Sequence, residues 1–260
     1  LDYVQMEGSI TMKEHGKYEI TSFTLHIIAM LAMLIDHIYF TLLNNKLWMN
    51  GIGRIAFPIF AFMIVEGYEH TGNIKKYMVR LLIFAIISEI PFNLMVSGSL
   101  FSPYQNVLWT FLISIVGIHL VEKIKYKYGS AAVLVFILSG ITVLLSFLLA
   151  MKVKSDYEGY GVLTVFVFYF FRKRKWTNLL FQIILLIFIN TVLLASYSYP
   201  IFNIGNMPFP MQGMGVLALI FIWSYNGRRG YYNKAVKYSY YLFYPLHMLI
   251  LSLIMLLQYY

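Results

Sequence analysis

The sequence predicts an all-α fold, namely a polytopic integral membrane helical bundle of about nine transmembrane helices. Of the 260 residues, 60% are hydrophobic and only 12% are charged, whereas soluble domains carry about 25% charged residues. The apolar residues also form continuous runs of helical length. Membrane barrels instead show segments of about ten residues that alternate in polarity. Low charge and long apolar runs together indicate membrane-spanning helices.

The apolar runs divide into long and short ones. A spanning helix needs about 20 mostly apolar residues, and five runs are long enough: Phe23–Leu43, Tyr77–Val96, Ala131–Met151, Leu179–Tyr197 and Tyr240–Leu257. Four shorter runs lie between them: Ile55–Tyr68, Val107–Val121, Tyr160–Phe171 and Met211–Tyr225. A short run spans if polar flanks help or the bilayer thins. Alternatively, it forms a half-helix or re-entrant segment that lines a cavity.

The distribution of Lys and Arg supports the count of nine helices. If nine helices are threaded alternately through the bilayer, 16 of the 20 basic residues fall on the side of the N-terminus. Four fall on the other side: Lys46, Arg54, Lys152 and Lys154. Cytoplasmic loops of membrane proteins are enriched in Lys and Arg. We therefore expect the N-terminus in the cytoplasm and the C-terminus outside.

The chain is expected to form one transmembrane domain. Residues 1–20 form a polar cytoplasmic arm without the apolar segment of a signal peptide, and residues 21–260 form the domain itself. The sequence contains no cysteine, which excludes disulfides, thiolate nucleophiles and cysteine-based metal centres. It also contains no phosphate-binding glycine loop or metal-ligand spacing, so no metal is predicted. The net charge of +9 does not indicate nucleic acid binding, because it accompanies long apolar runs.

Three ionisable residues lie in the first apolar run. His26 and His37 are eleven residues apart, so they share one helix face about 16 Å apart along the axis. Asp36 precedes His37, but adjacent residues on a helix point about 100° apart and do not face one another. Ionisable side chains within the bilayer are costly and usually face a bundle interior or a water-filled cavity. The pattern fits either a cavity wall leading to a reactive centre or helix packing in which neighbours satisfy each histidine.

Other polar residues sort by depth when the same topology is applied. Toward the outer side lie Asp36, His37, Arg54, Glu89, Gln105, Asn106, Asp156 and Gln212. Toward the cytoplasmic side lie Glu66, His70, Arg80, Tyr225 and Asn226, whereas Tyr240, Tyr244 and His247 form one stripe near mid-membrane. Convergence of so many polar groups near one leaflet favours a functional site. Each also has a structural explanation: Arg54 can anchor at the interface, Glu89 can pair with it or cap a helix, and Asp156 can be a solvated loop residue.

Several of these residues lie in sequence blocks that resemble the TraX family. The blocks cover most of the chain in the expected order: LHIIAMLAMLIDH (25–37), GRIAFPIFAFMIVEGY (53–68), RLLIFAIISEIPFN (80–93), QNVLWTF (105–111), DYEGYGVL (156–163), YNGRRG (225–230) and FYPLH (243–247). The family is named for a conjugation protein that acetylates the N-terminal amine of a pilin subunit in the inner membrane. It is similar to a wider superfamily of transmembrane acyltransferases, so the resemblance implies an enzyme of the bacterial cytoplasmic membrane.

The resemblance also implies roles for particular residues. Many members of the wider superfamily carry a basic residue, ten further residues and then a reactive His on the first helix. The matching positions here are His26 and His37, and His26 departs from the usual Lys or Arg. Most TraX-family members are not encoded with pili, so pilin is not carried over as the acceptor.

The implied reaction is transfer of an acetyl group from cytoplasmic acetyl-coenzyme A to an amine or hydroxyl at the outer face. The acceptor would be an exported or membrane-associated peptide N-terminus, glycan or small molecule. His37 would act as general base or as nucleophile, and Asp36 would fix its tautomer or bind the acceptor. Arg54 or Asn106 would stabilise the oxyanion, and Glu89 would position one of these donors. The residues expected to bind coenzyme A are His26, Arg80, Tyr225, Arg228, Tyr244 and His247.

Two other functions fit the same residues. Intramembrane His and Asp also suit the proton relay of a small secondary transporter or flippase, although we detect no inverted repeat, which many transporters have. A non-enzymatic assembly factor would instead bind a partner helix and would not need His37.

Overall fold

The computed structural model describes residues 20–194, 201–204 and 207–258. All but the last residue of the polar arm predicted for residues 1–20 therefore lies outside the described residues. Seven helical segments in the described part are long and apolar enough to cross a membrane. They are α1 (Ser22–Thr41), α2 (Leu47–Gly53) continued by α3 (Ala56–Glu69), α4 (Ile74–Ser97), α5 (Val107–Tyr128), α6 (Ala132–Val153), α8 (Trp176–Phe188) continued by the π-helical turn η1 (Ile189–Leu193), and α10 (Lys234–Gln258).

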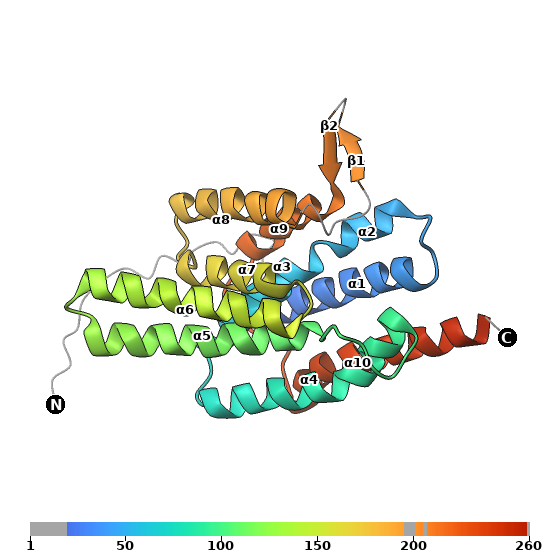
Figure 1. The fold of residues 1–260 in the computed structure, drawn as a ribbon, viewed down its shortest axis with the longest axis horizontal. Helices are drawn as coiled ribbons and strands as arrows, with labels where there is room; N and C mark the ends of the chain where they lie inside the picture. The colour runs from blue at the N-terminus through green and yellow to red at the C-terminus, as the bar shows by residue number, and fades with distance from the viewer. Residues whose placement is uncertain (1–19, 195–200, 205–206, 259–260) are drawn as a thin grey trace.

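Two shorter apolar segments complete the bundle. They are α7 (Glu158–Phe170) and the 3₁₀ helix η3 (Met211–Leu217) followed by α9 (Ala218–Trp223). The predicted all-α integral membrane bundle is confirmed, and these long and short segments correspond to the predicted helices. Figure 1 shows most of the helices running along the long axis of the molecule.

Two predicted short runs are parts of longer helices. The run that begins at Ile55 continues a span that starts at Leu47, and the run that begins at Val107 extends to Tyr128. Charged residues near the end of α5 do not stop it, because an exposed lysine is a good helix former. The sequence also did not reveal an antiparallel hairpin of β1 (Ile201–Ile204) and β2 (Met207–Pro210). This hairpin stands away from the helices (Figure 1).

Polar side chains and a glycine fix where several helices begin and end. The side chains of Thr21, Asn73 and Asn106 accept hydrogen bonds from amides in the first turns of α1, α4 and α5. Such N-caps satisfy amides that have no partner within the helix. Gly98 ends α4 in the left-handed conformation, which glycine adopts at little cost.

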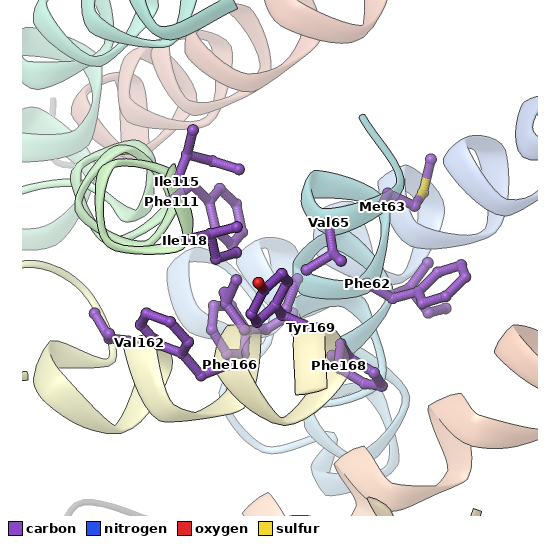
Figure 2. Close-up of a cluster of buried hydrophobic side chains, with 14 of the residues drawn as sticks. Phe62, Met63, Val65, Phe111, Ile115, Ile118, Val162, Phe166, Phe168 and Tyr169 are labelled. Carbon is purple, nitrogen blue, oxygen red and sulfur yellow. The ribbon is translucent and has the colours of Figure 1, made fainter. Parts of the chain in front are cut away.

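The apolar core lies where α3, α5 and α7 meet. Val65, Ile118, Phe168 and Tyr169 are almost fully buried there, and Figure 2 shows side chains of the three helices packed against one another. Nine of the thirteen residues of α7 are buried. This short helix is therefore enclosed by its neighbours, whereas α6 carries large exposed apolar residues such as Phe136.

Hydrogen bonds near the loops define two opposite ends of the bundle, and polar residues lie at each end. At one end, the amides of Ser22 and Phe23 donate to the carbonyls of Arg228 and Arg229. The guanidinium of Arg174 donates to three carbonyls, two in the last residues of α9 and one just after it. We call this the basic end. At the opposite, distal end, the segment around Gln105 pairs with residues 154–156. These described residues, which alternate threading assigns to two different sides, thus lie at opposite ends, and the end that faces the cytoplasm remains a prediction.

Candidate functional site

Two adjoining cavities open inside the bundle. The distal cavity, of about 500 Å³, is lined by residues of α1 to α5, the loop before α7, and α10. The basic cavity, of about 610 Å³, lies toward the basic end between α1, α3, α4 and α10. Five residues line both cavities: Met33, Phe60, Val107, Phe111 and Tyr244. The two cavities therefore share a wall and together run along the bundle.

An ion pair between Asp36 and Arg54 lies on the wall of the distal cavity. The Arg54 Nη2 donates to Asp36 Oδ2, and Asn50 Nδ2 donates to Asp36 Oδ1 at 3.0 Å. Both charged side chains are largely buried, with 15% and 18% of their surface exposed. The structure thus pairs Asp36 with Arg54, and Asp36 does not contact His37, whose tautomer it was predicted to fix.

A chain of amide side chains orients Arg54 from the other side. Arg54 Nη1 donates to Gln212 Oε1 at 3.0 Å, and Gln212 Nε2 donates to Asn190 Oδ1 at 3.0 Å. Asn190 in turn donates to the carbonyl of Leu186 at 2.8 Å. Arg54 Nε is buried and has no hydrogen-bond partner. One N–H of a firmly held guanidinium therefore remains unused beside the cavity.

Sequence reasoning missed two members of this network. Asn190 lies on the π-helical turn η1, and such turns are frequent at functional sites. Asn50 lies on α2, which precedes the predicted helix that begins at Ile55. The sequence did offer one signal for both residues, namely an asparagine within or beside an apolar run.

His37 is paired with a second histidine. Its Nδ1 lies 2.7 Å from Nε2 of His247 on α10, and the two rings are nearly parallel at 14°. His247 Nδ1 contacts the carbonyl of Phe243 at 2.6 Å. His37 lines the distal cavity, and no hydrogen bond to its Nε2 occurs within the described part of the chain. His247, predicted to bind coenzyme A, therefore contacts His37 instead, the histidine predicted to be reactive.

The loop between α6 and α7 supplies another wall of the distal cavity. Lys154, Tyr157 and Glu158 adopt positive φ angles of 54°, 61° and 47°, which is uncommon for residues with side chains and clusters at functional sites. Burial raises the pKa of Asp156 to about 6, although Arg54 opposes that rise. Glu158 Oε2 is buried without a hydrogen-bond partner. The strained loop and the first residue of α7 thus each present one carboxyl group to the cavity.

Glu89 and Asn106 form a separate cluster. Glu89 Oε1 accepts from the side chain of Asn106 and from Trp109 Nε1, the latter at 2.7 Å. Asn106 Nδ2 also donates to the carbonyl of Ala85, and its side chain caps α5. Neither Glu89 nor Asn106 lines the distal cavity. This pair joins α4 to α5, and Glu89 positions Asn106 away from the cavity wall.

The basic cavity combines cations with tyrosines. Its cations are Lys76, Arg80, Arg229 and Lys237, and its tyrosines include Tyr225, Tyr231, Tyr232, Tyr240 and Tyr241. His26 stacks on Tyr240, with ring centroids 3.9 Å apart, and its Nδ1 contacts the carbonyl of Ser22 at 2.8 Å. Burial and the nearby Glu66 raise the pKa of Tyr225 to about 12. The wall is therefore positively charged and rich in aromatic rings.

The predicted coenzyme A residues differ in their placement. His26, Arg80, Tyr225 and Tyr244 line the basic cavity. Arg228 is not among the lining residues, whereas its neighbour Arg229 is. Within the described residues, no three His, Asp or Glu side chains are arranged to hold a metal ion.

Comparison with known proteins decides the family. A family model described as "TraX protein" matches residues 22–255. The chain belongs to the TraX family. It is also 27% identical over 248 residues to the "Probable fimbrial assembly protein FimC, serogroup H1" of Dichelobacter nodosus, and the match covers 90% of this chain and 95% of that protein. No solved structure matches. The two histidines of the first helix, both cavities and His247 all lie within the matched region.

Proposed function

We propose that this TraX-family protein is a membrane-embedded acetyltransferase that uses acetyl-coenzyme A as donor. The observation that carries the proposal is the pair of adjoining cavities, which run from a cationic, tyrosine-lined end to His37. A donor bound at the basic end and an acceptor at the distal end would meet at His37. The charge bias of the loops supports a cytoplasmic basic end.

The basic cavity fits the chemistry of coenzyme A. Lys76, Arg80, Arg229 and Lys237 supply four cations, and Lys and Arg are the usual partners of phosphate groups. Tyrosine rings offer stacking surfaces for an adenine base. The pantetheine arm would extend past Met33, which lines both cavities, so that the thioester would reach the distal cavity.

His37 is the group proposed to start the reaction. Its Nε2 removes the proton from an acceptor amine or hydroxyl, whose nitrogen or oxygen then attacks the thioester carbonyl. A new bond to the carbonyl carbon forms, the carbon–sulfur bond breaks, and the coenzyme A thiolate takes the proton from His37. Alternatively, Nε2 attacks the thioester first, the carbon–sulfur bond breaks, and the coenzyme A thiolate leaves. The transient acetyl-imidazole then transfers its acetyl group to the acceptor, whose proton passes to the thiolate.

Arg54 is the proposed oxyanion donor. Its Nη1 and Nη2 are held by Gln212 and Asp36, and Nε has no partner. A pre-oriented N–H donor beside the reacting group is the arrangement that stabilises developing negative charge. Asn106 is a poorer candidate, because its amide bonds Glu89 and Ala85 and does not line the cavity.

The acceptor is proposed to be exported or membrane-associated. The similar protein of Dichelobacter nodosus is named as a probable fimbrial assembly protein, which makes a fimbrial subunit one candidate acceptor. The carboxyl groups of Asp156 and Glu158 beside the distal cavity would favour acceptors that carry an amine.

The Asp36 geometry weighs against a proton-coupled transporter. A relay through neighbouring Asp36 and His37 would need the two groups to exchange protons. Instead, Asp36 is bound to Arg54 and Asn50, and His37 contacts His247. Movement of substrate through vesicles in the absence of coenzyme A would nevertheless support the transporter.

Acetyl transfer by the purified chain in lipid nanodiscs tests the proposal. Hydroxylamine is a small nucleophile suited as acceptor, because acetyl-hydroxamate can be measured directly. We expect His37→Ala to lower the catalysed rate by about 10²-fold or more, as loss of a general base does. The matched control is His119→Ala, since His119 contacts Tyr68 and lines neither the distal nor the basic cavity. A folded wild-type protein with no rate above background would overturn the proposal.

Donor binding provides a separate test. Arg229→Ala should weaken binding of coenzyme A by about tenfold, because a hydrogen bond to a charged group contributes about 1.5–3 kcal/mol. Lys127→Ala removes the same charge near the basic end but lies outside the basic cavity, so it should have little effect. Equal affinities for both variants would exclude the basic cavity as the donor site.

A further inference from the structure

The hydrogen bonds of His247 define which of its nitrogens carries hydrogen. Its Nδ1 lies 2.6 Å from the carbonyl oxygen of Phe243, and a carbonyl only accepts, so Nδ1 is the protonated nitrogen. In a neutral imidazole the other nitrogen is then an acceptor. His247 is 95% buried, and no carboxylate of the described residues forms an ion pair with it. A neutral ring is therefore the form that its surroundings favour.

The tautomer of His37 follows from that of His247. The acceptor Nε2 of His247 lies 2.7 Å from Nδ1 of His37, so Nδ1 of His37 must carry a hydrogen and donate it. The hydrogen bond at one ring nitrogen determines the state of the other. Nε2 of His37 is consequently unprotonated, and His37 lines the distal cavity.

Asp36 cannot provide this control. The carboxylate next to His37 in sequence is the obvious group to orient it, yet both of its oxygens are bound, one to Arg54 and one to Asn50. His247 occupies the position that a carboxylate takes behind the base in many hydrolases. The nearly parallel rings, with centroids 4.9 Å apart, also fix the direction in which His37 points.

We propose that His247 is a positioning residue that holds His37 in the tautomer with a proton on Nδ1 and a lone pair on Nε2 directed to the distal cavity. This role rests on the proposed acetyl transfer for its functional meaning. The tautomer itself is independent of the reaction. Without a partner at Nδ1, neutral histidine prefers to carry its proton on Nε2, which can neither accept a proton nor attack a thioester.

Nitrogen NMR of the full chain in nanodiscs reads the tautomer directly. The chain contains six histidines, so ¹⁵N-histidine labelling gives few signals, and His37→Gln identifies those of His37. We expect a protonated Nδ1 and an unprotonated Nε2 in the wild type. In His247→Leu the preference should move toward protonated Nε2. A wild-type His37 protonated at Nε2 would overturn the proposal.

Kinetics with two substitutions separate positioning from packing. His247→Leu should lower kcat for acetyl transfer by roughly 100-fold and leave KM for acetyl-coenzyme A within about twofold, because the donor site is elsewhere. His247→Gln keeps an acceptor oxygen, so it should recover much of the lost kcat. Equal kcat values for His247→Leu and the wild type would overturn the proposal, as would equal losses in folded Leu and Gln variants.

The two proposals fail in different ways. If the wild type shows the expected tautomer and the expected response to His247→Leu but transfers no acetyl group, the positioning role is supported and acetyl transfer is overturned. If acetyl transfer depends on His37 but the tautomer is the opposite one, acetyl transfer stands and the role of His247 is overturned.

Discussion

Gly53 and Asp36 approach so closely that one added methyl group should disrupt the site. A Cβ atom built on Gly53 would lie 2.2 Å from Asp36 Cβ and 2.4 Å from its Cγ. Non-bonded carbon atoms prefer about 3.5–4.0 Å. Gly53→Ala therefore requires α1 and α2 to separate by about 1.5 Å at the point where Asp36 binds Arg54.

The size of the effect follows from this displacement. Overpacking of this kind costs about 1–3 kcal/mol, and the gain of up to about 1 kcal/mol for alanine over glycine in a helix offsets only part of it. A misplacement of about 1 Å at a reaction centre can lower the rate about 10²-fold. We thus expect Gly53→Ala to be less stable and to lose most acetyl transfer.

Gly51→Ala is the matched control on the same helix. A Cβ at Gly51 would meet only Met211 Sδ, at 3.2 Å, and a methionine side chain adapts easily. Thermal unfolding in nanodiscs and acetyl-hydroxamate formation should be measured for both variants. If Gly53→Ala equals Gly51→Ala in both measurements, the close packing of Asp36 against α2 is refuted.

Three further substitutions probe other parts of the site. Gln212→Leu should lower kcat by about tenfold or more, measured as acetyl-hydroxamate formation, because Arg54 Nη1 loses its acceptor. Asn106→Ala should lower the free energy of unfolding by about 0.5–2 kcal/mol through loss of the α5 cap and leave KM for acetyl-coenzyme A unchanged. The raised pKa of Asp156, about 6 against an ordinary 3.8, means that the folded state holds this proton more tightly. Stability should therefore fall by up to about 3 kcal/mol from pH 4 to pH 6 and stay level above that, and unfolding of Asp156→Asn across this range should lack that decrease.

Each of these outcomes has a clear opposite. A Gln212→Leu variant with wild-type kcat would show that Arg54 needs no second anchor. A raised KM in Asn106→Ala would place Asn106 in substrate binding rather than in helix capping. The same pH slope in Asp156→Asn as in the wild type would assign the titration to another group.

Part of the candidate site could be predicted from the sequence, because a few ionisable residues lie in or beside apolar runs. Asp36 and His37 stand out because charged or titratable groups within apolar runs are costly, and Arg54 lies directly before such a run. Their partners did not follow from the sequence, since adjacent residues on a helix point in different directions. As a result, Asp36 contacts α2 and Arg54, whereas His37 contacts His247 on α10.

Other features of the site and fold depend on contacts between residues that are far apart in the sequence. Asn190 is oriented by Gln212, which is 22 residues away and follows a hairpin. The short helix α7 has the composition of a membrane span, and only its enclosure by α3, α5 and α6 shows that it is a core helix. Apolar periodicity identifies such segments but does not say which neighbours cover them.

Transfer across a sealed bilayer is the most direct test of the proposed reaction path. Proteoliposomes should enclose a short charged peptide with a free N-terminal amine, and acetyl-coenzyme A should be added only outside. We predict N-acetylated peptide inside the vesicles, formed by the wild type and by His119→Ala but not by His37→Ala. No acetylated peptide inside, with acetylation only when the peptide is placed on the donor's side, would contradict a path that joins the two cavities.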